Sequence, residues 1–454
     1  MVSGGPSELF QSRSVLTGTA LGSAAVKQIL ADNIVKFLSF SGPCDSIPAL
    51  ERVSHRDWER VLLWLDDTGL AFYFLQKLKD TNSADVIPTA LLSRLETNFT
   101  ANQGRVEDMS RRLDALNHRF NDAGIGYAVL KGLSLVPEFC PYAPLRHQGD
   151  FDYLVDAQSL SVAQRVLVGA GYAPKDSPSS QEFIFVMPGA AAPSRSGRHY
   201  SADAPHAVEL HLDVWYSDLH RLPSLPNLFI VSRAKTHEWN GFAFPALTDE
   251  DAFVLQVVHA CQHLFGQWVR MSCFFEIGYF LKRRAHDTAF WNRIEQRVGD
   301  SLMLREFVVL VCELAAKLFA SPLPPMVRAW GARIRPGPRV WIEKYARLYA
   351  FCELPAYQFA LFPRSKLVLF LQNQYEADTT PRKAVDLKGA LPLSRLSRIV
   401  SSVRRNPSLV LNAGYWKHQL VVRRSIFHAL AGLRYLCEIP RWLWLNRARV
   451  HRHL

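Results

Sequence analysis

YAVLKGLSLVPEFCPYAPLRHQGDFDYLV, residues 127–155, is the stretch that decides how this chain folds. It begins with a short apolar run at residues 127–130 and ends with residues 150–155, where acidic and large apolar side chains alternate. Alternation with a period of two is typical of a β-strand, whose successive side chains point to opposite faces of a sheet. We therefore expect two strands here, with Asp150 and Asp152 on one face of the second strand and its apolar residues on the other.

The two aspartates of this strand are candidate metal ligands. Carboxylates two residues apart on one face can share divalent ions, which phosphoryl-transfer sites use to activate a hydroxyl and to hold a triphosphate. A bare D-x-D pattern is weak evidence, because a long chain contains one by chance. Residues 249–251 (DED) also fit the pattern, but they follow Thr248 at an apparent helix start. Acids there cap free N–H groups, so we assign them a structural role.

A second strand with acids on one face is expected at residues 208–215, VELHLDVW. Glu209, His211 and Asp213 fall on one side and the apolar residues on the other. Acids on one face of adjacent strands are costly unless solvent or a metal ion compensates their charge. We therefore expect either Glu209 or Asp213 to supply a third carboxylate, and His211 to line the same cleft.

A turn from a strand to a helix is expected at residues 130–134, LKGLS. Glycine lets the backbone approach a phosphate, and a helix N-terminus offers N–H donors. Lys131, Gly132 and Ser134 are therefore candidate phosphate ligands, with an ordinary turn as the alternative. Arg146 is expected either to bind a phosphate through two parallel hydrogen bonds or to pair with the aspartates.

These motifs together resemble the bacterial family of uncharacterised nucleotidyltransferases, a distant branch of the DNA polymerase beta-type superfamily. The resemblance covers roughly residues 25–370. It is carried by L-K-G at 130–132, R-x-x-G-D-x-D at 146–152, a helix that ends in Gly-Tyr at 171–172, the E-L-H strand at 209–211, and the H-x-x-x-H pair at 259–263.

The resemblance implies a short mixed sheet backed by helices, and a metal-dependent transfer of a nucleoside monophosphate from a nucleoside triphosphate to an acceptor hydroxyl. It makes Asp150, Asp152 and Glu209 catalytic residues that bind two Mg²⁺ ions, with Mn²⁺ as a possible substitute. Gly132 and Ser134 fall near the superfamily's Gly-Ser phosphate turn, although here one residue separates them. The acceptor is left open between a small molecule, a protein and an RNA end.

Helical periodicity surrounds this region. An apolar stripe with 3,4 spacing runs from Leu92 to Phe120 and predicts a long packing helix that starts after Pro88 and ends at Gly124. Further elements are predicted as helices at 159–171, 249–264, 269–284, 302–319 and 340–351 and as a strand at 182–187. We therefore predict an α+β fold, a small mixed-sheet nucleotidyltransferase-type domain embedded in a mainly helical protein.

The expected organisation is a flexible leader (residues 1–24), an N-terminal helical region (25–124), the α/β core (125–216), a second helical region (217–375), a linker (376–394) and a basic, aromatic-rich helical tail (395–454). The tail carries twelve Lys and Arg residues against one acid, and thus most of the formal charge of +12. Three roles stay open: binding nucleic acid, binding an anionic membrane or protein surface, and packing on the core with exposed arginines.

Composition excludes several classes. A chain with 48% hydrophobic and 21% charged residues is globular rather than disordered. Seven scattered cysteines without a C-x-x-C pair argue against a disulfide framework or a zinc ribbon and favour the cytoplasm. We see no apolar run long enough for a transmembrane segment and no secretory signal pattern. Walker, G-x-G-x-x-G and G-x-S-x-G motifs are also absent.

Three alternatives remain. His259 and His263 share one helix face, as a zinc site requires, but no Glu follows His259, so lining of the cleft or interior packing is favoured. Glu276, in an apolar helix, is expected to contact a substrate or to form a buried ion pair. The rival to an enzyme is a non-catalytic nucleotide-binding or scaffold protein that keeps the fold and docks a partner through the basic tail.

Overall fold

The structure is a computed structural model that describes residues 20–41, 47–51, 53–175, 181–188, 200–201, 206–214, 228–266 and 270–351, with eight further positions between 429 and 444. The predicted linker and most of the predicted basic tail and leader lie outside the described residues. The roles expected of these segments stay predictions.

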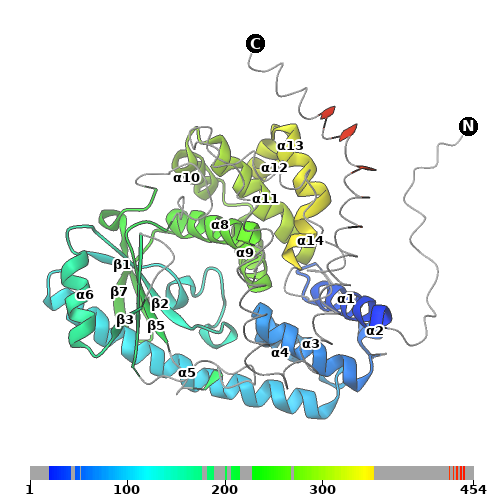
Figure 1. Cartoon of the computed structure of the whole chain (residues 1–454), viewed down its shortest axis with the longest axis horizontal. Coiled ribbons are helices and arrows are strands. Elements are labelled where there is room, and N and C mark those ends of the chain that lie inside the picture. The colour runs from blue at the N-terminus through cyan, green and yellow to red at the C-terminus, as the bar shows by residue number, and fades with distance from the viewer. Residues whose placement is uncertain are drawn as a thin grey trace, which may run out of the picture.

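A mixed sheet organises the α/β part, and the described residues contribute seven strands in the order β3-β4-β5-β2-β1-β7-β6 (Figure 1). The strands are β1 (Tyr127–Val129), β2 (Asp150–Val155), β3 (Ala173–Lys175), β4 (Glu182–Val186), β5 (Ala207–His211), β6 (Lys235–Trp239) and β7 (Phe242–Ala246). β2 is parallel to β5 and β1 to β7, whereas the other neighbours are antiparallel. The predicted α+β class is confirmed.

The hairpin of β6 and β7 lies beyond the limit of residue 216 predicted for the α/β core, so that limit is wrong. Asn240 and Gly241 form its two-residue turn with φ values of 44° and 86°, and Trp239 pairs with Phe242 on either side. Asn-Gly favours this turn because both residues tolerate positive φ. The sequence therefore held a signal for the hairpin, and the return to helical periodicity after it concealed that signal.

Two predicted boundaries differ from the observed ones. β5 ends at His211 rather than at residue 215, because its ladders with β2 and β4 end at Leu154 and Glu182, the register partners of His211; one further backbone hydrogen bond, from the Leu212 N–H to the Gln181 carbonyl, follows. Helix α1 (Ala20–Phe37) begins inside the predicted leader. Its buried residues, among them Leu30 and Ile34, pack into the core of the helical part, and this packing stabilises the helix.

One face of the sheet is covered by α5 (Thr89–Asp122) and α6 (Leu160–Gly169). α5 confirms the long helix predicted from the apolar stripe. Phe120 of α5 and the sheet residues Tyr127 and Tyr153 contact one another edge to face, with ring centroids 5.0–5.7 Å apart. Such aromatic contacts favour a dry core, so this face has a structural role.

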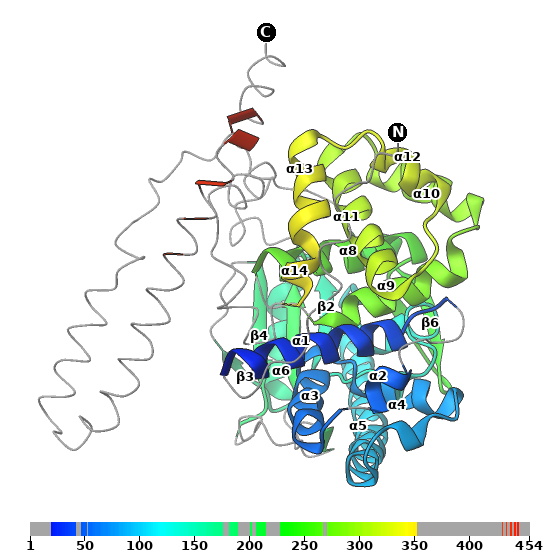
Figure 2. The same ribbon diagram turned by 90° about the vertical axis from the view of Figure 1, so that its right-hand side faces the viewer.

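The opposite face turns toward α8 (Asp249–Gly266) and α9 (Met271–Arg284), as Figure 1 shows. The other helices described are α1, α2 (Ile47–Glu51), α3 (His55–Thr68), α4 (Ala71–Asp80), α10 (Thr288–Val298), α11 (Leu302–Phe319), α12 (Pro325–Gly331), α13 (Pro336–Trp341) and α14 (Arg347–Ala350). Helices from both ends of the described chain share one hydrophobic core, in which α1 lies against α3 and α11 (Figure 2). Asp32 of α1 also pairs with Arg347 of α14 at 2.8 Å.

Candidate active site

The parallel pair of β2 and β5 brings acidic side chains together on the face that turns toward α8 and α9. Asp152 is in register with Glu209, and Leu154 with His211. One possible ligand atom from each of Asp152, Glu209 and His211 lies within 4.8 Å of the other two, and we call these three residues the acidic cluster. Of the two candidates for a third carboxylate, the structure places Glu209 beside Asp152.

Asp150 and Asp213 lie outside the acidic cluster. Asp150 begins β2 and is partly exposed, and strand alternation puts it on the same face as Asp152. Asp213 follows the end of β5 and lines a cavity described below. The catalytic role predicted for Asp150 therefore stays a prediction.

Asp152 is the most highly connected residue of the cluster. Lys131 Nζ donates a hydrogen bond to Asp152 Oδ1 at 2.9 Å, and His211 Nε2 lies 3.2 Å from the same oxygen. Burial raises the pKa of Asp152, but Lys131 and His211 outweigh burial and hold this pKa well below its ordinary value. Burial in turn lowers the pKa of Lys131, but Asp152 and the other acids raise it overall. Both groups are therefore charged at neutral pH.

Glu209 and Asp150 have the opposite tendency. Burial, then the charges of Asp152 and Asp150, raises the pKa of Glu209 to about 9. Burial and the charge of Asp152 also raise the pKa of Asp150, against the opposing charges of Lys131 and two arginines. Glu209 is thus protonated at neutral pH unless another cation approaches. A divalent cation would replace that proton, and the carboxylates of Asp152 and Glu209 are oxygen donors that Mg²⁺ and Mn²⁺ prefer, so the residues present fit a metal ion.

The turn predicted to bind phosphate is closed by its own surroundings. Gly132 has a φ of 70°, and a Cβ added there would lie 2.2 Å from Nε2 of Gln148. That amide donates to the Asp150 carbonyl at 2.7 Å, and the Ser134 hydroxyl donates to the Lys131 carbonyl at 3.2 Å. Glycine is therefore required at residue 132 by conformation and by packing. The phosphate-binding role of Gly132 and Ser134 stays a prediction.

Arg146 pairs with Glu276, not with the aspartates. Its Nε donates to Glu276 Oε1 at 3.1 Å, and the Tyr73 hydroxyl donates to the same oxygen at 3.0 Å. Glu276 is 1% exposed, so the alternative of a buried ion pair is the one the structure shows. This pair connects the segment before β2 to α4 and α9.

His259 and His263 lie in contact on α8, with their Nε2 atoms 2.9 Å apart. Burial, followed by the charges of Lys131 and His263, lowers the pKa of His259 well below its ordinary value. Within the described part of the chain, the pair has no third metal-ligating side chain close enough to complete a site. A neutral His259 near Lys131 supports the interpretation that these residues line the cleft.

The second D-x-D pattern has a structural role, as expected, but its acids form ion pairs and the capping side chain is that of Thr248. The Asp251 N–H donates a hydrogen bond to the Thr248 hydroxyl oxygen at 3.3 Å, so Thr248 caps the start of α8. The Asp251 carboxylate accepts hydrogen bonds from Arg233 at 3.0 Å and Arg297 at 3.4 Å.

Sequence reasoning missed His147, Gln148 and Arg270. His147 and Gln148 are the two unspecified positions of the R-x-x-G-D-x-D motif, so their location was available, although their identity carried no signal. Arg270 immediately precedes α9, and its Nη2 lies 3.3 Å from His147 Nδ1. No motif surrounds Arg270 in the sequence, and only packing brings it to the site.

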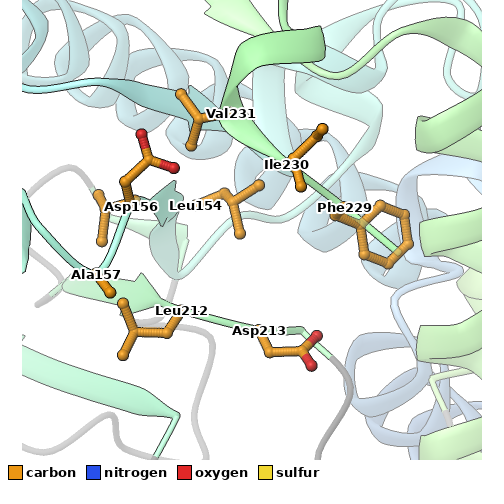
Figure 3. Close-up of a pocket in the computed structure, with 9 residues that line it drawn as sticks. Leu154, Asp156, Ala157, Leu212, Asp213, Phe229, Ile230 and Val231 are labelled. Carbon is orange, nitrogen blue, oxygen red and sulfur yellow. The ribbon is translucent and has the colours of Figure 1, made fainter. Parts of the chain in front are cut away.

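A cavity of about 160 Å³ opens at the carboxyl ends of β2 and β5 (Figure 3). Most of its side chains are aliphatic or aromatic, but its accessible lining is more polar than apolar, and the carboxylates of Asp156 and Asp213 lie at either side of it. The lining residues are Leu154, Val155, Asp156, Ala157, Leu212, Asp213, Phe229, Ile230 and Val231. Because Leu154 is the register partner of His211, the cavity begins one side chain beyond the acidic cluster.

A family model described as uncharacterised nucleotidyltransferase matches residues 54–320, more than half of the chain. Comparisons with curated proteins and with solved structures gave no significant match. The matched segment contains the whole described sheet, the acidic cluster and helices α8 to α11. The chain belongs to the uncharacterised nucleotidyltransferase family.

Proposed function

We propose that this protein transfers a nucleoside monophosphate from a nucleoside triphosphate to an acceptor hydroxyl and releases pyrophosphate. The observation that carries the proposal is the acidic cluster on two adjacent parallel strands, in a chain of a nucleotidyltransferase family. Two carboxylates beside an imidazole are a donor set for a divalent cation, and such cations are what phosphoryl transfer requires.

Mg²⁺, with Mn²⁺ as a substitute, is the proposed cofactor, bound by Asp152 and Glu209 with Asp150 and His211 beside them. When bound, the metal would lower the pKa of the acceptor hydroxyl and offset charge on the triphosphate. Lys131 holds Asp152 ionised and therefore ready to bind a cation, and it contributes positive charge near the phosphates.

The bond changes balance without a further reactant. The acceptor oxygen forms a bond to the α-phosphorus, and the bond from that phosphorus to the oxygen bridging the β-phosphorus breaks. Pyrophosphate leaves with the electron pair of that bond. A carboxylate oxygen of Glu209, which is ionised once the cation has displaced its proton, accepts the hydroxyl proton.

The acceptor is proposed to approach from the cavity at the carboxyl ends of β2 and β5. This cavity adjoins the acidic cluster and has room for a small group on a small molecule, a protein side chain or an RNA end. The basic tail is proposed to assist by contacting an anionic partner or membrane surface. None of the helices in the described part of the chain is both long and apolar enough to cross a membrane. We propose the cytoplasm as the site of action on the basis of the scattered cysteines.

The test compares pyrophosphate release by wild type, Glu209→Gln and Glu238→Gln, with each nucleoside triphosphate, Mg²⁺ or Mn²⁺, and cell extract as the source of acceptor. Gln resembles the protonated form of Glu209, so this variant should fold with wild-type stability while release falls by about 10²–10³-fold. Glu238 is exposed on β6 of the same sheet, so Glu238→Gln is the matched control and should keep full activity.

Asp152→Asn should also abolish transfer, with the fold checked by circular dichroism. An unchanged rate in both Asp152→Asn and Glu209→Gln would rule the mechanism out. The alternative is a non-catalytic nucleotide-binding or scaffold protein, which the closed turn at Gly132 favours. Nucleotide binding without pyrophosphate release from any nucleoside triphosphate would support that alternative.

A further inference from the structure

Three cationic side chains converge beside the start of β2: Lys131, Arg146 and Arg270. Arg146 pairs with Glu276 of α9, and Arg270, the residue before α9, contacts His147, the chain neighbour of Arg146, so both arginines lie between the segment before β2 and α9. Lys131 is paired with Asp152 of the acidic cluster, so this cation belongs to the metal side of the cleft. Arg146 and Arg270 lie beside the N-terminal half of α9.

Arg146 is fixed in place but retains donors. Among the described residues, its side chain has one hydrogen-bonded partner, Glu276, which it contacts through Nε. The guanidinium carries two further nitrogens with N–H donors in a rigid fork, the geometry that matches phosphate oxygens. Glu276 is itself held by the hydroxyl of Tyr73, so it acts as a positioning residue for Arg146.

Arg270 occupies a position that is unfavourable without an anion. It is the residue before the first turn of α9, where free N–H groups and the helix dipole already provide positive charge. In the described part of the chain it has no carboxylate in contact, and its hydrogen-bond partner is the ring of His147. His147 packs edge-on against Tyr200 with ring centroids 5.3 Å apart, so the Arg270 head group is ordered before any ligand arrives.

The phosphate turn expected from the sequence cannot easily serve the same purpose. Gln148 fills the space beside Gly132, and the Ser134 hydroxyl already donates its hydrogen bond to the Lys131 carbonyl. A triphosphate therefore needs another set of donors. Arg146, Arg270 and the N-terminal end of α9 supply charge, forked donors and free N–H groups at one place.

We propose that Arg146, Arg270 and the N-terminal end of α9 bind the β- and γ-phosphates of the nucleoside triphosphate and hold the pyrophosphate as it leaves. This inference rests on the proposed function and adds to it the side of the site from which pyrophosphate leaves. Arg146 precedes Asp150 by four residues, whereas the cavity lies past the other end of β2. The leaving group and the acceptor would then approach the α-phosphorus from opposite directions, which is the arrangement of an in-line displacement.

Binding of inorganic tripolyphosphate with Mg²⁺, measured by titration calorimetry, tests the inference without a choice of base. Arg270→Gln should weaken binding by at least about tenfold, and Arg270→Lys should weaken it less, because charge is kept while the fork is lost. Arg283→Gln is the matched control, since Arg283 lies at the other end of α9 and pairs with Glu138 on the surface. It should bind as wild type does, and all three variants should melt at the wild-type temperature.

The outcomes separate this inference from the proposed function. Equal tripolyphosphate affinity in wild type and Arg270→Gln, with pyrophosphate release intact in wild type, would overturn the phosphate assignment and leave the function standing. Arg270-dependent tripolyphosphate binding in a protein that releases no pyrophosphate from any nucleoside triphosphate would support the phosphate site and remove the enzymatic function. Loss of tripolyphosphate binding in Arg283→Gln as well would show general charge attraction and would also overturn the assignment.

Discussion

The two faces of strands β2 and β5 are made by the same backbone and have opposite properties. On one face, Phe151 and Tyr153 are 1% and 0% exposed and pack with α5 and α6 in a dry core. On the other, Asp152, Glu209 and His211 share a space with Lys131. The neighbouring side chains thus alternate between aromatic packing and a charged cluster within a single strand.

The apolar face of these strands stabilises the fold enough to offset the cost of the charged face. Burial raises the pKa of Glu209 to about 9. This shift shows that removing several acidic groups from water and holding them next to one another destabilises the fold. The dry face supplies apolar burial and aromatic contacts that offset this cost. Substitutions should therefore divide cleanly, with those on the dry face changing stability and those on the charged face changing chemistry.

The largest effect on stability is expected from Tyr153→Ala, which should lower the free energy of unfolding by about 3–5 kcal/mol. The ring is fully buried between Phe120 and Tyr127, and its removal leaves a cavity. Tyr153→Phe keeps the ring and loses only the hydrogen bond to Asn117, 3.0 Å in length, so it should cost about 1 kcal/mol. Urea unfolding measures both changes.

Pyrophosphate release by Tyr153→Phe should stay near the wild-type rate at a temperature where the variant is folded. This is the reverse of the result expected for Glu209→Gln, which loses activity and keeps stability. A Tyr153→Phe variant that is stable but inactive would show that the two faces are not independent.

Gly132→Ala tests the packing of the turn that follows β1, and it should lower the free energy of unfolding by about 2–3 kcal/mol. The positive φ strains any Cβ, and Gln148 occupies the space that the methyl group needs. Gly124→Ala is the matched control, because Gly124 has a φ of 66° and nothing within 4 Å of an added Cβ, so it reports the strain alone. It should cost about 1 kcal/mol.

Gln148→Ala in the Gly132→Ala background should recover part of the loss, giving a coupling energy of about 1 kcal/mol in a double-mutant cycle. Additive costs would mean that Gln148 moves aside freely. In that case the turn could open to a phosphate, and the argument for the alternative phosphate site on α9 would weaken.

The smallest expected effect is on the pH dependence of the free energy of unfolding, and it comes from His206 beside the apolar face. Burial, then the charges of Arg112 and Arg105, lowers the pKa of His206 to about 4. The unfolded chain, with an ordinary histidine pKa near 6.5, binds the proton more readily, so the free energy of unfolding should fall as pH decreases from about 6.5 to about 4. We expect His206 to account for about 1–2 kcal/mol of that fall.

His206→Gln should flatten this pH dependence, measured by urea unfolding at pH 7 and at pH 5. Gln keeps a polar group near the Tyr172 hydroxyl, which lies 2.8 Å from His206 Nε2. His118, exposed on α5, provides the control, and His118→Gln should leave the slope unchanged. A slope that is identical in wild type and His206→Gln would show that His206 is not held neutral by the fold.

Much of the fold could be predicted because its signals are local. Alternation gave β1, β2, β4 and the start of β5, and 3,4 spacing gave α5, α6, α8, α9 and α11. The hairpin of β6 and β7 was not predicted, although Asn240-Gly241 is a turn signal, because its two strands are short and helical periodicity begins directly after them. The end of β5 could not be predicted, since a strand ends where its neighbours stop pairing, and that is a property of the sheet.

The candidate site divides in the same way. The carboxylates Asp150, Asp152 and Glu209 could be found because the R-x-x-G-D-x-D and E-L-H patterns resemble a known family. His211 was expected to line the same cleft, but its direct contact with Asp152 could not be predicted, because that contact depends on the register of β2 with β5. Arg270 had no signal at all.

The sequence by itself determined which side chains share a face, because alternation and helical spacing follow from backbone geometry over a few residues. Only the tertiary structure decided which of them meet. Arg146 pairs with Glu276, 130 residues away, rather than with the aspartates four and six residues along the chain. The side chain of Gln148 fills the space beside Gly132. The physical reason is that burial makes an unpaired charge or an empty space costly, and the partner that removes the cost is set by packing.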